Sequence, residues 1–125
     1  NNKDNFDFED SARMHNCAGI VARYELQKSQ DIHSIEAHFV RLDEIAIATN
    51  PFELFLDYGN QIRARSKASQ TFLIQLACGS DAYLPTKKAE EGGHYSAYVS
   101  SGIIGHQGGE LLVRKTVDAI NDMWE

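Results

Sequence analysis

The stretch from Glu44 to Ala77 limits the fold more than any other part of the chain. Two strand-like segments, residues 44–49 and 70–77, flank a helical pattern that opens at Asn50. A strand, a helix and a second strand in this order form a crossover unit, in which the two strands run parallel and the helix packs across them. We therefore expect an α/β or α+β fold, with a small sheet built on a strand-helix-strand crossover.

Further elements flank this unit, and the N- and C-terminal ones are helices. They are a helix from about Asp7 to Lys28, a strand over Ile35–Val40, a short helix over Lys87–Glu91 capped by Thr86, a short strand or ordered loop over His94–Ser101, and a last helix with an apolar stripe at Val113, Val117, Ile120 and Trp124. The spacing of that stripe is typical of a helix face packed on a core.

The size and charge of the chain exclude several classes of protein. The 125 residues, 42% of them hydrophobic, suffice for one domain over residues 1–125, in which we expect residues 1–6 to be disordered. The net charge of -6 disfavours nucleic acid and anionic membranes as partners. No apolar run approaches the roughly 20 residues of a membrane span. The chain lacks an initiating Met, so we interpret it as a processed product or an excised piece of a longer protein.

Several residues often found in sites have no site-forming spacing here. Cys17 and Cys78 lie far apart, which predicts two buried free thiols rather than a disulfide or a zinc finger. The five histidines, at positions 15, 33, 38, 94 and 106, form no metal-binding motif. The glycine-rich segment 105–109 precedes a helix and resembles a phosphate cradle, but an ordinary glycine turn is the stronger interpretation.

Glu53 has a structural interpretation that is complete in itself. Asn50 is a strong helix N-cap, Pro51 is favoured at the first helical position, and Glu53 then falls at the third. A Glu at that position can accept a hydrogen bond from the N–H of the cap residue, which completes a capping box. The local sequence thus predicts that Glu53 lies in the first turn of a helix that opens at Asn50.

Glu53 also has a partner in the predicted topology. Tyr83 follows the second strand of the crossover unit, as Glu53 follows the first, and ligands bind beyond the carboxyl ends of such strands. We expect the two side chains to lie within about 10 Å of each other in one crevice. Their oxygens are acceptable zinc ligands, but a zinc site needs about four donors, so the chain alone should bind zinc weakly or not at all.

Four short segments resemble the C-terminal part of the neutral/alkaline, non-lysosomal ceramidase-like proteins. They read NPFELF from Asn50, QTFLIQLA from Gln70, AYLPT from Ala82 and EEGGHY from Glu90, and the resemblance covers roughly residues 36–124. It implies a zinc-dependent amidohydrolase that cleaves the N-acyl bond of a lipid amide such as ceramide. Zinc would be held by two His, a Glu and a Tyr, of which Glu53 and Tyr83 match the last two.

The resemblance also implies a missing partner. The two His ligands belong to the N-terminal catalytic region of such proteins, so the isolated chain should be inactive and zinc should bind only in the full-length parent. The segment before Tyr83 departs from the family, which usually has Asn-Gly-Tyr where this chain has residues 78–81. That departure leaves a second interpretation open, a non-catalytic accessory or interaction domain that keeps the fold without the activity.

Overall fold

The computed structural model describes residues 7–125, and the predicted disorder of residues 1–6 lies outside this range. The chain forms two compact units, residues 1–33 and residues 34–125. The first contains one described helix, α1 (Phe8–Gln27), which begins where the Asp7 side chain accepts a hydrogen bond from the N–H of Asp10 at 2.8 Å. This confirms the predicted N-terminal helix, and an Asp is a favoured residue at that cap position. A lone helix forms no core of its own, so the division leaves the prediction of one domain over residues 1–125 untested.

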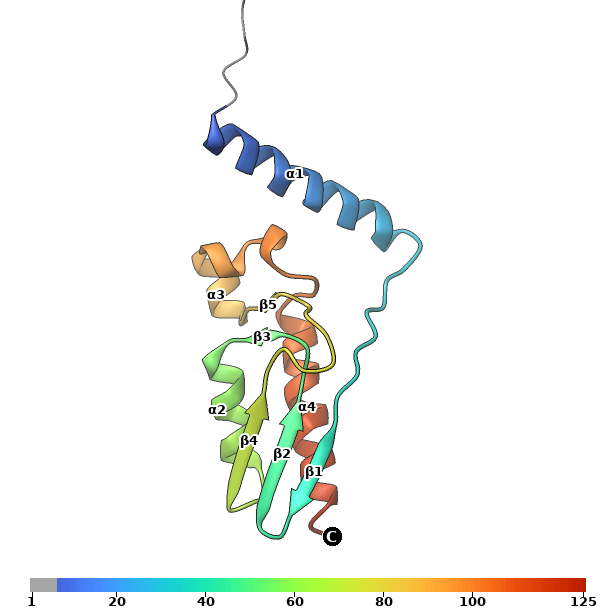
Figure 1. Cartoon of the computed structure of the whole chain (residues 1–125), viewed down its shortest axis with the longest axis vertical. Helices are drawn as coiled ribbons and strands as arrows, with labels where there is room; N and C mark the ends of the chain where they lie inside the picture. The colour runs from blue at the N-terminus through green and yellow to red at the C-terminus, as the bar shows by residue number, and fades with distance from the viewer. Residues whose placement is uncertain (1–6) are drawn as a thin grey trace, which may run out of the picture. The chain divides into compact units, whose positions relative to one another are not determined.

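The second unit is built on a three-stranded sheet (Figure 1). Strand β1 (Phe39–Leu42) pairs antiparallel with β2 (Ile45–Thr49), and β2 pairs parallel with β4 (Gln70–Ile74). Helix α2 (Leu56–Arg65) connects the two parallel strands. The mixed fold with a strand-helix-strand crossover is therefore confirmed, with shorter elements than the sequence patterns predicted.

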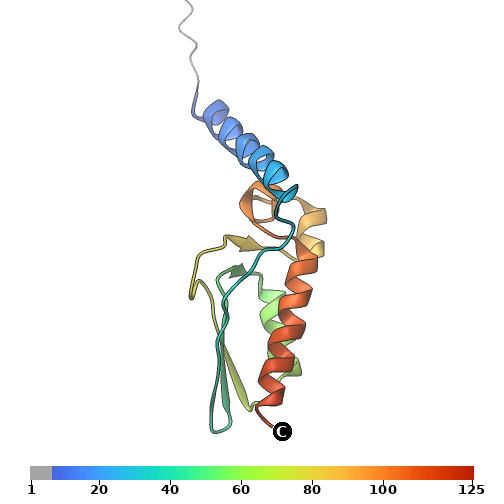
Figure 2. The ribbon, with the colours of Figure 1, turned by 90° about the vertical axis from the view of Figure 1, so that its right-hand side faces the viewer.

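Two helices cover one face of this sheet, as Figure 2 shows. They are α2, which packs on β4, and the last helix, α4 (His106–Asp122), which packs on β1 and β2. The two helices also pack against each other. The sheet contributes small side chains to this contact, because Ala46 and Ala48 are the buried residues of β2. The stripe predicted on α4 is confirmed at three positions, since Val113, Val117 and Ile120 are buried in the core.

The opposite face of the sheet carries larger apolar side chains. The strand register aligns Val40 with Ile47 and Phe72 on this face. Val40 is 45% exposed and Phe72 46% exposed, and Leu42 and Ile74 beside them are exposed to a similar extent. Bulky residues thus occupy the exposed face and alanines the covered one, the reverse of what burial alone would favour.

A second, smaller sheet lies beyond the ends of β2 and β4. It pairs β3 (Glu53–Leu54) in parallel with β5 (Tyr83–Leu84). Helix α3 (Lys87–Gly92) follows with Thr86 as its cap, as predicted. Residues 94–101 form two 3-10 turns, η1 (Tyr95–Ala97) and η2 (Val99–Ser101), which corresponds to the ordered-loop alternative. Across the described residues, no helix combines the length and the apolar character that a bilayer crossing requires.

The capping-box prediction is wrong. Helix α2 begins at Leu56 after Phe55, five residues later than expected, and Glu53 lies in β3 instead. The Asn50 side chain does accept a backbone hydrogen bond, from Phe52 N at 3.0 Å, but as a local turn. The N–H of Glu53 donates to Ala82 O at 2.9 Å. In the first turn of a helix the same N–H would have no partner within the helix.

The prediction of buried thiols is also wrong. Cys17 lies on α1 and Cys78 lies in the loop between β4 and β5, and both are free and exposed. The prediction rested on the general tendency of free Cys to be buried. Neither segment packs into the core, since no residue of α1 is buried and the Cys78 loop lies at the end of the sheet.

Candidate functional site

The structure brings Glu53 and Tyr83 together as partners in one ladder. They face each other in the parallel pair of β3 and β5, in which adjacent strands lie about 4.8 Å apart. The expectation that the two residues approach within about 10 Å is therefore confirmed. The sequence predicts their proximity from the neighbouring strands that each residue follows. In the structure the two residues are instead paired directly with each other in a separate small sheet.

The two side chains interact with each other. The Tyr83 hydroxyl hydrogen-bonds the Glu53 carboxylate, and this bond, together with the negative charge of Glu53, raises the pKa of Tyr83 above its ordinary value. Both residues are only partly buried. The ring of Tyr95 lies edge-on to that of Tyr83 with the centroids 5.9 Å apart, so it covers one side of the phenol. The arrangement is an accessible pair of oxygen atoms, one on a carboxylate and one on a phenol that keeps its proton.

The loop that leads to Tyr83 is conformationally strained. Leu76, Cys78 and Ala82 all have φ between 53° and 62°, which is costly for residues with a side chain beyond hydrogen. Such strain persists only where surrounding contacts hold it, and it often marks functional segments. Here the loop is tied to the sheet by bonds from Ala77 N to Asn50 O and from Asp81 N to Pro51 O.

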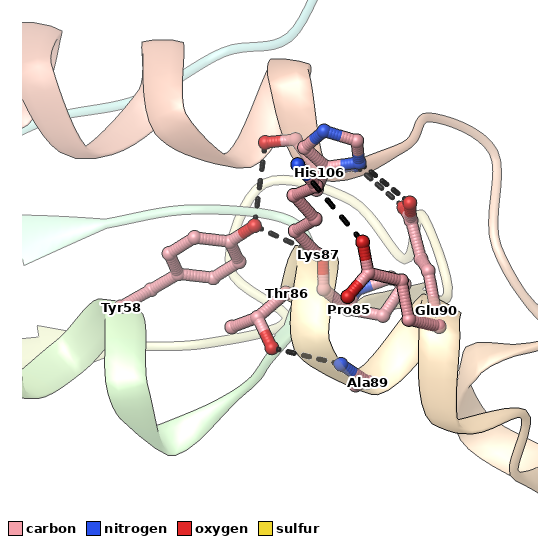
Figure 3. A network of polar contacts seen from close by, with 8 residues as sticks. Tyr58, Pro85, Thr86, Lys87, Ala89, Glu90 and His106 are labelled. Carbon is pink, nitrogen blue, oxygen red and sulfur yellow. Dashed lines mark hydrogen bonds and ion pairs between the residues drawn. The ribbon is translucent and has the colours of Figure 1, made fainter.

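A buried hydrogen-bond network fixes the far end of β5 (Figure 3). The Tyr58 hydroxyl donates to Pro85 O at 2.9 Å and lies 3.3 Å from His106 O. The pKa of Tyr58 is raised to about 12, chiefly by burial and to a smaller extent by the charges of Glu110 and Glu90. Tyr58 therefore stays protonated and anchors Pro85, two residues after Tyr83.

The glycine-rich segment 105–109 forms the N-terminal turn of α4, with Gly105 as the cap residue, and a carboxylate of the same chain binds there. The carboxylate of Glu90 accepts a hydrogen bond from His106 N at 2.7 Å and contacts His106 Nδ1 at 2.5 Å (Figure 3). A negative charge is favourable at a helix N-terminus. The segment is thus better described as a turn capped by Glu90 than as a phosphate cradle.

Glu53 and Tyr83 fit a zinc ion only in part. They offer one carboxylate and one phenol oxygen, two of the roughly four donors that zinc requires. Among residues 7–125, the one group of three His, Cys, Asp or Glu side chains with ligand atoms close enough for an ion does not include Glu53. Their role as metal ligands stays a prediction, and any further ligands would have to come from outside the described residues.

That group of three lies elsewhere and consists of Glu36, His38 and Cys78. Sequence reasoning missed it because Cys78 is 40 positions from His38, and only the folded loop brings it close. One signal was available, since Glu36 and His38 stand two residues apart on one face of a predicted strand.

Comparison of the chain with models of known protein families, with curated protein sequences and with solved structures found no match.

Proposed function

We propose that this chain is the C-terminal segment of a ceramidase-like, zinc-dependent amidohydrolase, to whose metal site it contributes Glu53 and Tyr83. The observation that carries the proposal is the direct pairing of the two residues in β3 and β5. The resemblance predicted both as ligands of one ion, and ligands of one ion must be neighbours. A pairing between two two-residue strands is not expected from sequence periodicity, so it supports the proposal independently of the pattern that suggested it.

The chemistry expected of the chain's own residues follows from their contact. Bound zinc would polarise an amide carbonyl and lower the pKa of a bound water. Glu53 supplies a negative charge, and Tyr83 supplies a hydroxyl whose proton the carboxylate holds. A cation near Glu53 would weaken that hold on the proton, because it would offset the carboxylate charge. The pair is therefore suited to accept a metal ion without rearranging the backbone.

The exposed face of the main sheet is suited to binding a partner protein. Val40, Leu42, Phe72 and Ile74 expose a contiguous apolar surface, and such surfaces often mark protein contacts. We propose the N-terminal catalytic region of the same protein as that partner, and a lipid amide as the substrate. The alternative is a non-catalytic accessory domain, favoured by the departure from the family at residues 78–81 and by the two His ligands that the resemblance places outside these residues.

The test is to express the complete reading frame that encodes this chain. Its zinc content is measured by elemental analysis, and hydrolysis of an N-acylated sphingoid base is followed by release of the fatty acid. We expect one bound zinc and activity. Glu53→Gln and Tyr83→Phe should each lower kcat/KM and zinc affinity, with kcat/KM falling about 100-fold or more. Glu91→Gln is the matched control, because Glu91 is an exposed carboxylate whose ion pair with Lys87 is 3.9 Å long.

Two results would decide against the enzyme. A folded full-length protein with neither zinc nor hydrolysis would leave the accessory domain as the better account. Activity that survives both Glu53→Gln and Tyr83→Phe would show that the pair is not part of the metal site.

A further inference from the structure

Three side chains of different chemistry converge on the surface at one end of the main sheet. Ligand atoms of Glu36, His38 and Cys78 all lie within 4.8 Å of one another. Glu36 and His38 come from the segment that leads into β1, and Cys78 comes from the loop after β4. The set combines a carboxylate, an imidazole and a thiol, the three kinds of side chain that zinc binds.

The backbone holds both contributing segments in place. His38 N donates to the Thr49 side chain at 2.8 Å, and Thr49 N donates back to His38 O at 3.0 Å. The residue before Cys78 donates its N–H to Asn50 O at 3.1 Å. Thr49 and Asn50 are consecutive residues at the end of β2, so His38 and Cys78 are both fixed to the same point of the sheet.

The separation of the ligand atoms suits a small ion. Zinc bonds to sulfur at about 2.3 Å and to nitrogen or oxygen at about 2.0–2.2 Å, so ligands around one zinc ion lie roughly 3–4 Å apart. All three side chains are exposed and need only small rotations to reach that spacing. His38 Nε2 and Glu36 Oε1 lie 2.7 Å apart, so the two atoms would separate slightly when both bind one ion.

We propose that Glu36, His38 and Cys78 form a surface site for a zinc-like transition-metal ion, separate from the Glu53–Tyr83 pair. Thiolate and imidazole ligands favour zinc or cobalt over magnesium and calcium, which prefer oxygen. A carboxylate and a thiolate neutralise a divalent charge. Metal binding releases the thiol proton to solvent, and water fills the fourth position. The 125-residue chain therefore binds zinc by itself, contrary to the expectation from Glu53 and Tyr83 alone.

The test uses cobalt as a spectroscopic substitute for zinc. The chain, kept reduced with a non-thiol reductant, is titrated with Co²⁺, and near-ultraviolet absorption from sulfur-to-cobalt charge transfer is recorded. We expect a saturable band, with one ion per chain, that Zn²⁺ abolishes and excess Mg²⁺ does not. Calorimetric titration with Zn²⁺ should give a dissociation constant on the order of 1 μM or lower.

Variants assign the band to the three residues. Cys78→Ser should abolish the band, and His38→Gln should weaken zinc binding about 10-fold or more, with a smaller effect for Glu36→Gln. Cys17→Ser combined with His15→Gln is the matched control, since both residues are exposed on α1, and it should bind as the unaltered chain does. Far-ultraviolet circular dichroism verifies that each variant is folded.

Three outcomes would overturn the proposal. One is the absence of a charge-transfer band at millimolar Co²⁺. Another is a band that Cys17→Ser removes and Cys78→Ser leaves intact. The last is zinc binding that Tyr83→Phe removes while Cys78→Ser and His38→Gln do not, which would assign the ion to the Glu53–Tyr83 pair instead.

Discussion

Tyr58 and Tyr83 both have a raised pKa, but the main physical cause differs between them. Tyr58 is 2% exposed, and burial is the main cause of its raised pKa. Tyr83 is partly exposed, and its hydrogen bond to Glu53 is the main cause. The Tyr58 hydroxyl donates to backbone carbonyls, whereas the Tyr83 hydroxyl meets a charged side chain. The first arrangement stabilises the fold, and the second leaves a charge available to a ligand.

This difference predicts where substitutions should be costly. Tyr58 is buried and belongs to the hydrophobic core, so changes around it should lower the free energy of unfolding. The Glu53–Tyr83 pair contacts solvent, so changes there should affect titration and ligand binding more than stability. Each substitution below tests one side of this contrast.

The largest loss of stability is expected for Gly109→Ala. A Cβ at Gly109 would lie 2.4 Å from the Tyr58 ring, and that ring is buried and cannot move aside. Overpacking of this kind costs about 3 kcal/mol. Urea denaturation of the chain measures the effect. Gly92→Ala, at a position with nothing within 4 Å of the added Cβ, is the control. Equal stabilities for the two variants would contradict the tight packing around Tyr58.

The next effect is a dependence on alkaline pH. The pKa of Tyr58 is raised from 10.0 to about 12, so the folded chain keeps a proton that the unfolded chain loses. The stability contributed by this difference is present below pH 10 and is lost as the pH rises towards 12, roughly 2–3 kcal/mol in all. Tyr58→Phe should lower stability by about 1 kcal/mol at pH 7 and remove that part of the alkaline decline. Parallel pH profiles for both chains would contradict the account.

On the Tyr83 side, Asn50→Ala should have the largest effect on stability. Asn50 is 4% exposed, and its side-chain oxygen accepts the N–H of Phe52 just before β3. Loss of this buried bond should cost about 1–2 kcal/mol, as the free energy of unfolding in urea would show. The cost arises from the turn rather than from a helix cap. A variant as stable as the unaltered chain would mean that the turn forms without the Asn50 side chain.

The smallest effect on stability is expected for Glu53→Gln. The amide oxygen can still accept the Tyr83 hydroxyl, and the site is accessible to water, so the change should stay within about 0.5 kcal/mol. Chemical denaturation at pH 7 measures it. A loss above about 2 kcal/mol would place Glu53 with the structural residues around Tyr58 and break the contrast between the two tyrosines.

The crossover unit could be predicted from the sequence because its strands and helix carry clear periodic patterns over several residues each. The pairing of β3 with β5 could not, since two-residue strands have no periodicity. The Asn50 signal was misread because a capping motif and a turn use the same residue, and contacts with distant residues decided between them. Glu36, His38 and Cys78 were missed because their proximity depends on a strained loop.

The central claim is that Glu53 and Tyr83 form one coupled pair, and the titration of Tyr83 tests it most directly. Selectively ¹³C-labelled tyrosine rings report each phenol's pKa by NMR, and Tyr83→Phe assigns the signal. In the unaltered chain the pKa of Tyr83 should lie above its ordinary value of 10.0, and Glu53→Gln should lower it towards that value while the pKa of Tyr58 stays raised. A Tyr83 pKa that Glu53→Gln leaves unchanged would contradict the coupling and the shared site built on it.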